Sequence, residues 1–415
     1  MSAAPQRCDI AIIGGGLAGA SLALILAQAL PGVQLTLVES QAFANPNDAL
    51  LQPSFDGRST ALAPSSVAVF QALGLWEALA AYATAIESIH VSDAGHWGLS
   101  QFERADNAGE PLGYVVENAG FGRVLLPALQ AHPNIQVLAP DVVQQLVPVA
   151  GGTRLVLAQG ELIASLTLIA DGADSPLRRQ LGIGVREQSY HQQALVANVA
   201  FSQPHGARAY ERFTAEGPLA LLPLGRRASA CTSALVWTFP EQAIDAAMAM
   251  PDAELLALLQ TTFGFRLGRF TRIGQRAAYP LRLVVAEEQV RSGLVLLGNA
   301  AHFLHPVAGQ GFNLSLRDGL RLAEVLAAGH AQGVALGDLA LLQTYQQAQQ
   351  PDQDQTIFLS HSFSQVFSRQ GQHWRWGRDL AMLSLEFHPL LRSRFIQQLA
   401  GKSGPAARPW GAYGR

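Results

Sequence analysis

The sequence predicts an α/β protein in which a parallel sheet is accompanied by a second, antiparallel sheet. Three apolar runs, at residues 9–13, 166–170 and 294–297, each lead into a glycine-containing turn. Such runs are typical of strands that are buried on both faces of a parallel sheet. A separate set of strand-like runs fits an antiparallel sheet: Ile86–Ser92, Leu195–Phe201, Leu219–Leu224 and Ser233–Phe239.

Length and composition set the scale of the molecule. At roughly 150 residues per domain, the 415 residues allow two or three domains. Apolar residues make up 49% and charged residues 14% of the chain, which supplies a sizeable core and argues against disorder. The net charge of −3 argues against nucleic-acid binding through a basic surface. Cys8 and Cys231 provide neither a disulfide framework nor a metal site, and they favour a reducing compartment.

The first forty residues allow two interpretations. No charge occurs between Asp9 and Glu39, so a signal peptide or a membrane span has to be weighed. The glycine triplet at 14–16 and Gly19 would weaken a hydrophobic helix in this stretch. We therefore expect a cytoplasmic protein that is soluble or peripheral to the inner membrane.

A strand, a turn, a helix and a second strand follow one another in this stretch. The turn matches the pattern G-x-G-x-x-G at residues 14–19. Gly14 permits the tight turn, Gly16 lets backbone approach a pyrophosphate, and Gly19 lets the helix pack closely on the strand. The helix N-terminus attracts phosphate, and Glu39 after the second strand can accept hydrogen bonds from ribose hydroxyls. The stretch predicts a dinucleotide site for FAD or NAD.

A second turn follows the run at 166–170. Asp171 stands at the rim of the predicted sheet, Gly172 makes the turn, and Ser175 can cap the helix that Pro176 begins. By itself this segment is typical of an ordinary strand-to-helix connection.

The third turn follows the run at 294–297 and leads into a helix from Asn313 to about residue 328. Gly309 and Gly311 allow backbone to lie against a flat ligand, and the helix points its N-terminus at that ligand. A flavin ring becomes anionic on reduction, so a positive helix end there would stabilise it. His302 and His305 flank this turn, and we expect both to be structural histidines.

The three segments Gly14–Gly19, Asp171–Arg178 and Gly298–Asn313 resemble, in order and separation, the motifs of the class A flavoprotein aromatic hydroxylases. Within that family the chain is most similar to the ubiquinone-biosynthesis hydroxylases, above all those of 2-polyprenyl-6-methoxyphenol. The narrower resemblance rests on residues 55–62, 86–93, 211–223 and 305–314. It covers residues 9 to about 345.

The resemblance implies a fold and a domain organisation. An FAD-binding, Rossmann-like domain of the glutathione-reductase type would comprise residues 1–85, 111–185 and 281–345. A substrate domain with an antiparallel sheet would comprise 86–110 and 186–280. Residues 346–415 would form a helical C-terminal region.

The resemblance also implies an activity. The enzyme would bind FAD, consume NAD(P)H as a transient co-substrate, and hydroxylate the ring of a polyprenylated methoxyphenol in ubiquinone biosynthesis. A flavin C4a-hydroperoxide would deliver the oxygen, which requires a site that excludes water. Three alternatives stay open: a related hydroxylase for another ring position or a soluble aromatic substrate, an FAD oxidase or dehydrogenase without oxygen insertion, and a non-enzymatic FAD- or NAD-binding scaffold.

Roles for individual residues follow from the same resemblance. The residues that would contact FAD are Gly14, Gly16, Gly19, Glu39, Arg58, Arg123, Asp171, Gly298, Asn299, Pro306, Gly309, Gln310, Gly311 and Asn313. Asp171, Pro306 and Gln310 would act nearest the reaction. The family usually has Asp at position 299, and the amide oxygen of Asn299 can still accept the same hydrogen bond.

The expected partners are a polyprenylphenol-type lipid and either a membrane surface or a biosynthetic complex, and homo-oligomer formation stays open. Aromatic residues of the C-terminal region either pack in a core or form an apolar surface that contacts a membrane or a protein partner. They include Phe358, Phe363, Phe367, Trp374 and Trp376.

Overall fold

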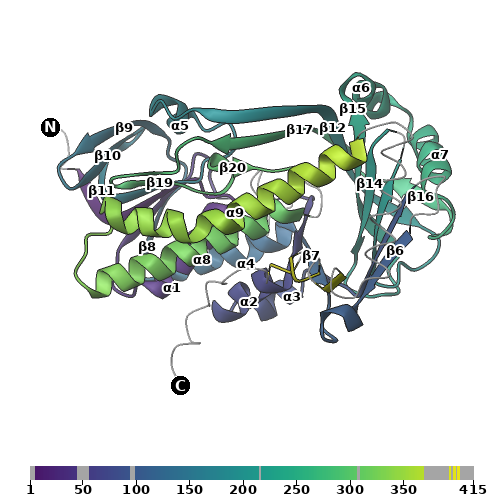
Figure 1. Ribbon diagram of the computed structural model, residues 1–415, viewed down its shortest axis with the longest axis horizontal. Helices are drawn as coiled ribbons and strands as arrows, with labels where there is room; N and C mark the ends of the chain where they lie inside the picture. Colours follow the sequence, from purple (N-terminus) through teal and green to yellow (C-terminus); the bar gives the residue numbers. More distant parts are fainter. Residues whose placement is uncertain are drawn as a thin grey trace.

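The computed structural model describes residues 5–43, 56–93, 99–214, 216–305 and 309–368, with 392–393, 396–398 and 400–401. Figure 1 shows two sheets arranged along the long axis of the molecule. The helices α8 (Gln310–Ala331) and α9 (Leu339–Ser368) run beside each other in front of the first sheet, and α9 extends toward the second.

The first sheet is largely parallel. Its strands follow the order β18-β19-β11-β1-β2-β8, and the five strands from β19 to β8 pair in parallel. The hairpin of β9 and β10 continues β11 in antiparallel fashion. The bounds are β1 (Gln6–Ile13), β2 (Leu35–Val38), β8 (Ile135–Leu138), β9 (Val143–Val149), β10 (Gly152–Leu157), β11 (Gly160–Ile169), β18 (Val290–Arg291) and β19 (Leu294–Leu296).

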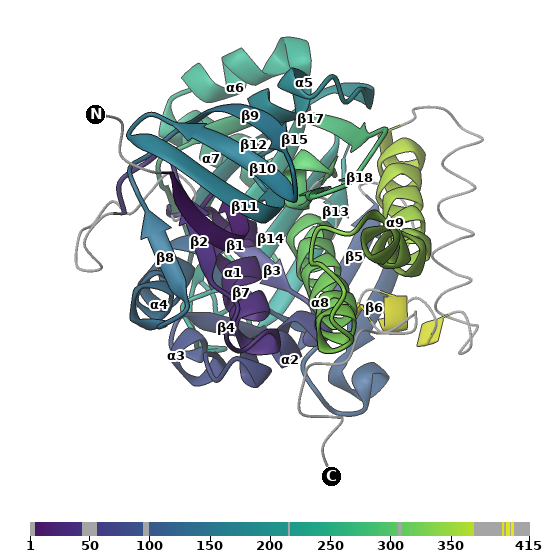
Figure 2. The ribbon, with the colours of Figure 1, turned by 90° about the vertical axis from the view of Figure 1, so that its left-hand side faces the viewer.

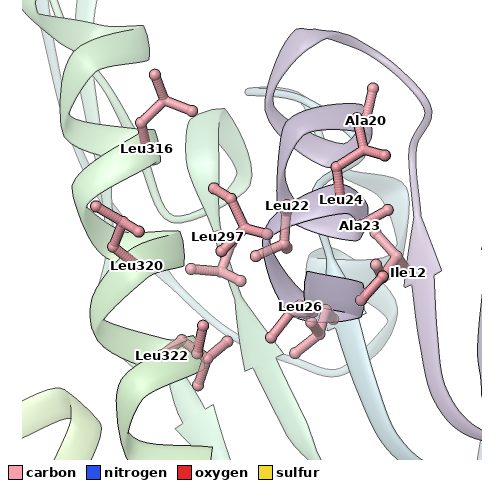
Figure 3. Packing of buried hydrophobic residues seen from close by; sticks show 14 of the residues in the cluster. Ile12, Ala20, Leu22, Ala23, Leu24, Leu26, Leu297, Leu316, Leu320 and Leu322 are labelled. Carbon is pink, nitrogen blue, oxygen red and sulfur yellow. The ribbon is translucent and has the colours of Figure 1, made fainter. Parts of the chain in front are cut away.

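Helices cover one face of this sheet and the β9–β10 hairpin covers the other (Figure 2). The helices are α1 (Leu17–Ala29), α4 (Asn118–Ala131) and α8. Leu22 and Leu26 of α1 pack with Leu297 and Leu320 in the largest core cluster (Figure 3). Gly319 lets α1 and α8 approach closely, because a Cβ atom there would lie 3.2 Å from Leu22 Cδ1.

The second sheet follows the order β20-β17-β12-β15-β14-β13-β5-β6, with β16 beside β12. All neighbours pair antiparallel except β13 and β5, which are parallel. The bounds are β5 (Ser88–Asp93), β6 (Leu99–Glu103), β12 (Val185–Phe201), β13 (Arg208–Phe213), β14 (Pro218–Leu224), β15 (Thr232–Pro240), β16 (Phe270–Ile273), β17 (Ala277–Ala286) and β20 (His302–Phe303).

One face of the second sheet is closed by α6 (Ile244–Ala249) and α7 (Asp252–Phe263). Trp237 of β15 and Leu255 of α7 are fully buried in the core between them. The opposite face is therefore the one available for a ligand.

A small sheet and several short helices complete the described fold. The small sheet has the order β3-β7-β4. The bounds are β3 (Ser59–Leu62), β4 (Ala83–Ile86), β7 (Gly113–Glu117), α2 (Pro64–Ala72), α3 (Trp76–Ala80), α5 (Pro176–Gln180), and the 3₁₀ turns Arg104–Asn107, Glu241–Ala243 and Gly298–Ala300.

The structure confirms the predicted fold class. The four strand-like runs lie in β4 and β5, β12, β14 and β15. The uncharged N-terminal stretch forms β1, α1 and β2 inside the first core, which explains its lack of charge. Among the described residues, none of the helices combines the length and the apolar character needed to cross a bilayer.

Three of the predicted domain boundaries, at residues 186, 281 and 346, fall within continuous elements. Residue 281 lies inside β17, and residue 186 lies inside β12, and these two long strands pair with each other. The last helix begins at Leu339, earlier than the predicted boundary at residue 346. Of the tail aromatics, Phe358 is 67% exposed, whereas the side chains of Phe363 and Phe367 and the residues Trp374 and Trp376 lie outside the described residues.

Candidate functional site

The three glycine turns lie at one edge of the parallel sheet. Ile13 of β1 pairs with Val38 of β2 and with Ile169 of β11, and Ile169 pairs with Leu296 of β19. The strands therefore end at the same level. The residues that follow them at this edge are Gly14, Glu39, Asp171 and Gly298. The carboxyl edge is where α/β sheets bind ligands.

The first turn depends on glycine at two positions. Gly14 has φ 104°, and a Cβ atom there would lie 2.5 Å from the carbonyl oxygen of Ala170. A Cβ atom on Gly19 would overlap the carbonyl oxygen of Gly14. The turn delivers the chain to Gly16, the N-cap of α1, where no side chain caps the helix. Its first N–H groups are therefore available to an anion.

Glu39 stabilises the same turn through hydrogen bonds to backbone N–H groups. Its Oε2 accepts a hydrogen bond from Gly15 N–H at 2.6 Å, and its Oε1 accepts one from Gln41 N–H at 2.8 Å. Gly15, which the motif leaves unspecified, is also constrained, because a Cβ atom there would lie 2.9 Å from the Glu39 Cβ. Carboxylate oxygens accept more than one hydrogen bond, so Glu39 can hold the turn and still bind hydroxyl groups.

A polar groove of about 650 Å³ extends along this edge. Residues from all three turns line it, together with polar residues from neighbouring segments: Gly14, Gly16, Glu39, Arg58, Ser59, Thr60, Asn118, Asp141, Asp171, Asn299 and Ser315. The groove thus unites segments that are far apart in the sequence.

Asp171 gives the groove an unpaired acid. Both of its carboxylate oxygens are buried without a hydrogen-bond partner among the described residues. Burial raises the pKa of this carboxyl, and the nearby Ser175 hydroxyl and Arg178 guanidinium oppose the rise only in part. A buried unpaired acid is costly, so this side chain is suited to a hydroxyl-bearing ligand in the groove.

Arg178 ties the second turn to the third. Its guanidinium is buried and donates to the carbonyl oxygens of Ala300 and Ala173, both at 2.8 Å. Asn299, beside this link, is exposed at the groove. The sequence motif includes Arg178, but its bridging role was not predicted.

Of the two predicted arginines, only Arg58 lines the groove. Its Nε atom pairs with Asp56 at 2.6 Å, and its guanidinium lies over the Tyr279 ring. Arg123 lines neither described cavity and lies over the ring of Tyr82. Near the start of the same helix, Asn118 reaches the groove instead. Arg123 was selected from the family resemblance, and its contact with a flavin stays a prediction.

The third turn presents the start of α8 to a second cavity. Gly309 is the N-cap with φ 60°, and no side chain caps this helix. Gln310 and Gly311 follow and line the cavity. A Cβ atom on Gly311 would meet nothing within 4 Å, so this face is open. Pro306 lies outside the described residues.

Asn313 serves the protein framework. Its Oδ1 accepts hydrogen bonds from Ala63 N–H and Ser66 O–H, and its Nδ2 donates to the carbonyls of Ala61 and Gly309, all at 2.6–2.9 Å. The side chain thus anchors the first turn of α8 to the end of β3. The predicted direct contact of Asn313 with a cofactor stays a prediction.

The second cavity has a volume of about 430 Å³ and is mostly apolar. The inner face of the second sheet supplies much of its lining: Ile89, Val91, Phe102, Ala209, Phe213, Ala220, Leu222 and Val236. It meets the polar groove at Ser59, Thr60, Asn299 and Phe312, which line both. One continuous site therefore has a polar arm and an apolar arm.

Three titratable side chains line the apolar arm, Tyr210 and Glu211 of β13 and His305. Burial raises the pKa of Glu211 to about 7 and lowers the pKa of His305 to about 4. The carbonyl of His305 accepts a hydrogen bond from Ser360 of α9 at 3.3 Å. Sequence reasoning missed Glu211, although the alternation of polar and apolar residues in β13 places it on one face with Ala209 and Phe213.

His302 lies behind the third turn. Its Nε2 and the Asp318 carboxylate are 2.5 Å apart, and both side chains are fully buried. Gln353 of α9 donates to the other Asp318 oxygen at 3.0 Å. The structure thus supports the expected structural role of His302, since it does not line either described cavity.

Comparisons with known proteins identify the family of this chain. Residues 7–358 match the family model described as FAD binding domain. The chain is 34% identical over 406 residues to the ubiquinone hydroxylase UbiL of Rhodospirillum rubrum, spanning 97% of this chain and 92% of that protein. It is 32% identical over 403 residues to the 3-demethoxyubiquinol 3-hydroxylase of Escherichia coli, spanning 95% and 99%.

A solved structure has the same fold. The p-nitrophenol 4-monooxygenase PnpA of Pseudomonas putida superposes with a TM-score of 0.77 at 17% identity, covering 96% of this chain and 99% of that one. At this level of identity the likeness establishes the fold alone.

Proposed function

Because this chain belongs to the FAD-binding domain family, we propose that it is a monooxygenase that hydroxylates an aromatic ring in ubiquinone biosynthesis. It uses FAD as cofactor and NAD(P)H as co-substrate, and its substrate is a polyprenylated methoxyphenol. The observation that carries the proposal is the junction of a polar groove with an apolar cavity at Ser59, Thr60, Asn299 and Phe312. A dinucleotide fits the polar groove, and a prenylated ring fits the apolar cavity.

The residues of the groove suit FAD. The uncapped start of α1 would hold the pyrophosphate, Glu39 would accept hydrogen bonds from ribose hydroxyls, and Asp171 and Asn299 would contact the ribityl chain. Two features of the structure support this fit. The Asp171 oxygens are buried and unpaired, and Gly311 leaves open space where the flat ring would lie.

Bound FAD, reduced by NAD(P)H, supplies the chemistry that activates O2 for insertion of one oxygen atom into the ring. The start of α8 contributes a positive electrostatic potential toward negative charge on a ring beside Gly309. The apolar side chains of the second sheet hold the substrate and exclude water. Asn313 holds the first turn of α8 in place through its four hydrogen bonds.

The lipid character of the substrate bears on where the protein acts. Phe358 of α9 is 67% exposed. An exposed aromatic ring on the surface of an enzyme with a lipid substrate suits contact with a membrane surface. We include peripheral membrane contact, or membership of a biosynthetic complex, in the proposal. Removal of this ring by Phe358→Ser should reduce co-sedimentation with lipid vesicles.

A product assay tests the proposed activity. The purified protein is saturated with FAD and supplied with NADH or NADPH, a prenylated 2-methoxyphenol and ¹⁸O2. We expect one labelled oxygen in the ring of the product. Oxidation of the nicotinamide without labelled product would indicate an oxidase, and failure to bind FAD in an absorbance titration would refute the proposal altogether.

A further inference from the structure

The apolar cavity contains one acid whose position the proposed activity has not yet explained. Glu211 stands in the middle of β13, opposite Val91 of β5 and Ala220 of β14. Both partners line the cavity, as do Ala209 and Phe213 on either side of Glu211 in the strand. The carboxyl group is thus surrounded by apolar side chains on the inner face of the sheet.

Glu211 is the only acidic residue among the described residues that line this cavity. Its carboxyl forms no hydrogen bond or ion pair within the described part of the chain, and burial alone raises its pKa to about 7. Such a group costs stability unless a ligand uses it. An acid that lines the cavity adjoining the polar arm is therefore a candidate for contact with the reacting ring.

We propose that Glu211 binds the ring hydroxyl of the aromatic substrate and removes its proton during hydroxylation. This inference rests on the proposed function and adds a catalytic residue to it. The carboxylate Oε forms an O–H bond with the hydroxyl proton, while the phenol O–H bond breaks. The electron pair stays on the phenolate oxygen and is delocalised into the ring, which makes the ring carbon a better nucleophile toward activated oxygen.

The pKa of Glu211 suits this task. A general base works best when its pKa lies near the working pH, because it is then ionised and still basic enough. An ordinary glutamate, with a pKa of about 4.3, would be a far weaker base toward a phenol of pKa about 10. His305 lines the same cavity, but its lowered pKa makes it the weaker base of the two.

Other ionisable side chains on the strands around Glu211 could also affect its pKa. Arg208 and Arg212 of β13 are on the opposite face, where they donate to Ser88 Oγ and to the carbonyl of Thr262. The strands β14 and β15 carry none. Further ionisable groups around the cavity are Tyr210 of β13, His90 and Asp93 of β5, Glu103 of β6, Tyr114 and Glu117 of β7, His302 of β20, and His305. Burial, and not a neighbouring charge, raises the pKa of Glu211.

The test compares Glu211→Gln with Glu216→Gln in the full-length FAD-loaded protein. Glu216 is exposed on the turn between β13 and β14, so it is a matched control. General bases typically contribute about 10²–10⁴-fold, and we expect Glu211→Gln to lower kcat for a prenylated 2-methoxyphenol by about 100-fold. Its FAD titration should match the wild type, since Glu211 does not line the groove.

A pH profile separates a base from a structural residue. For the wild type and Glu216→Gln, kcat/KM should rise with pH to a plateau with an apparent pKa near 7, and Glu211→Gln should lose this dependence. Glu211→Asp should recover part of kcat. The inference is wrong if the wild type makes product while Glu211→Gln retains both its rate and its pH profile. Absence of product with the wild type would instead refute the proposed function.

Discussion

The polar groove and the apolar cavity meet in one site but are built in different ways. The groove is assembled from ends of parallel strands, where a few glycines and polar residues in short segments set the geometry. The cavity is assembled mainly from alternate residues of β5, β6, β13, β14 and β15, each of which contributes two to four residues. Local motifs therefore specify the geometry of the groove, whereas the pairing of distant strands specifies the lining of the cavity.

The largest expected effect is on the groove. In Gly19→Ala the new Cβ atom overlaps the carbonyl oxygen of Gly14, so α1 has to move away from the turn. We expect FAD affinity to fall by about 100-fold, equivalent to about 2.7 kcal/mol, together with a stability loss of about 1–3 kcal/mol. Gly57→Ala, where nothing lies within 4 Å of the added atom, is the control. A normal FAD titration for Gly19→Ala would contradict the claim that local geometry specifies the groove.

The next largest effect is expected at Arg178, which links the second and third glycine turns. Arg178→Met removes the donors of two hydrogen bonds and leaves the Ala173 and Ala300 carbonyls without them. Each unsatisfied buried group costs about 1–3 kcal/mol, so urea unfolding should show a loss of about 3 kcal/mol. FAD affinity should fall by about tenfold. Arg179→Met, at an exposed position of the same helix, should leave both quantities unchanged.

Gly311→Ala tests the junction of the two arms. The added Cβ atom meets no protein atom within 4 Å, and alanine favours a helix over glycine by about 0.5–1 kcal/mol. The melting temperature should therefore stay equal or rise. Product formation should fall by about tenfold, because the methyl group occupies space needed by the ring system. Equal activity in both proteins would show that the ring does not lie against α8.

Ala220→Phe perturbs only the apolar arm. Its side chain lines the cavity, so we expect KM for the prenylated substrate to rise by about tenfold, or about 1.4 kcal/mol, with FAD affinity unchanged. Leu221, the next residue, is fully buried on the other face. Leu221→Phe should instead destabilise the fold by about 1–3 kcal/mol through overpacking. If both variants changed KM and stability in the same way, the assignment of Ala220 and Leu221 to opposite faces of β14 would be wrong.

The smallest expected effect concerns Asp171 and depends on pH. Below a pH of about 3.9, the carboxyl is protonated in both folded and unfolded chains, and Asp171→Asn should equal the wild type in stability. Because burial raises the folded-state pKa, ionisation penalises the folded wild type as the pH rises above that value. The FAD-free variant should then become the more stable protein, although it binds FAD less tightly. Denaturant unfolding at pH 4 and pH 7 measures the difference.

Much of the fold could be predicted from the sequence, because buried parallel strands and glycine turns leave local signals. Gly14, Gly16, Glu39 and Asp171 were predicted for the site, and all four line the groove. Arg123 was selected from the family resemblance, and Asn118, which lines the groove, was not predicted, since nothing local shows which turn of α4 faces the groove. Glu211 was missed because its importance depends on the strands that surround it, and strand order cannot be read from one sequence.

Domain boundaries were less predictable for a related reason. The paired strands β12 and β17 run without interruption through the predicted boundaries at residues 186 and 281. Their amino-acid composition does not change at these positions. A linker rich in glycine, proline or polar residues, which normally marks a boundary, is absent from these strands. The division into domains stays a prediction.

The four hydrogen bonds of Asn313 have a consequence for how such a chain can change over evolutionary time. Aspartate has no donor for the carbonyls of Ala61 and Gly309, and leucine has neither donor nor acceptor. No single replacement at this position preserves the whole arrangement. Three of the four partners are backbone groups, and only Ser66 contributes a side chain. We expect drift to be tolerated on the outer face of α8, whereas positions 66 and 313 change together or stay as they are.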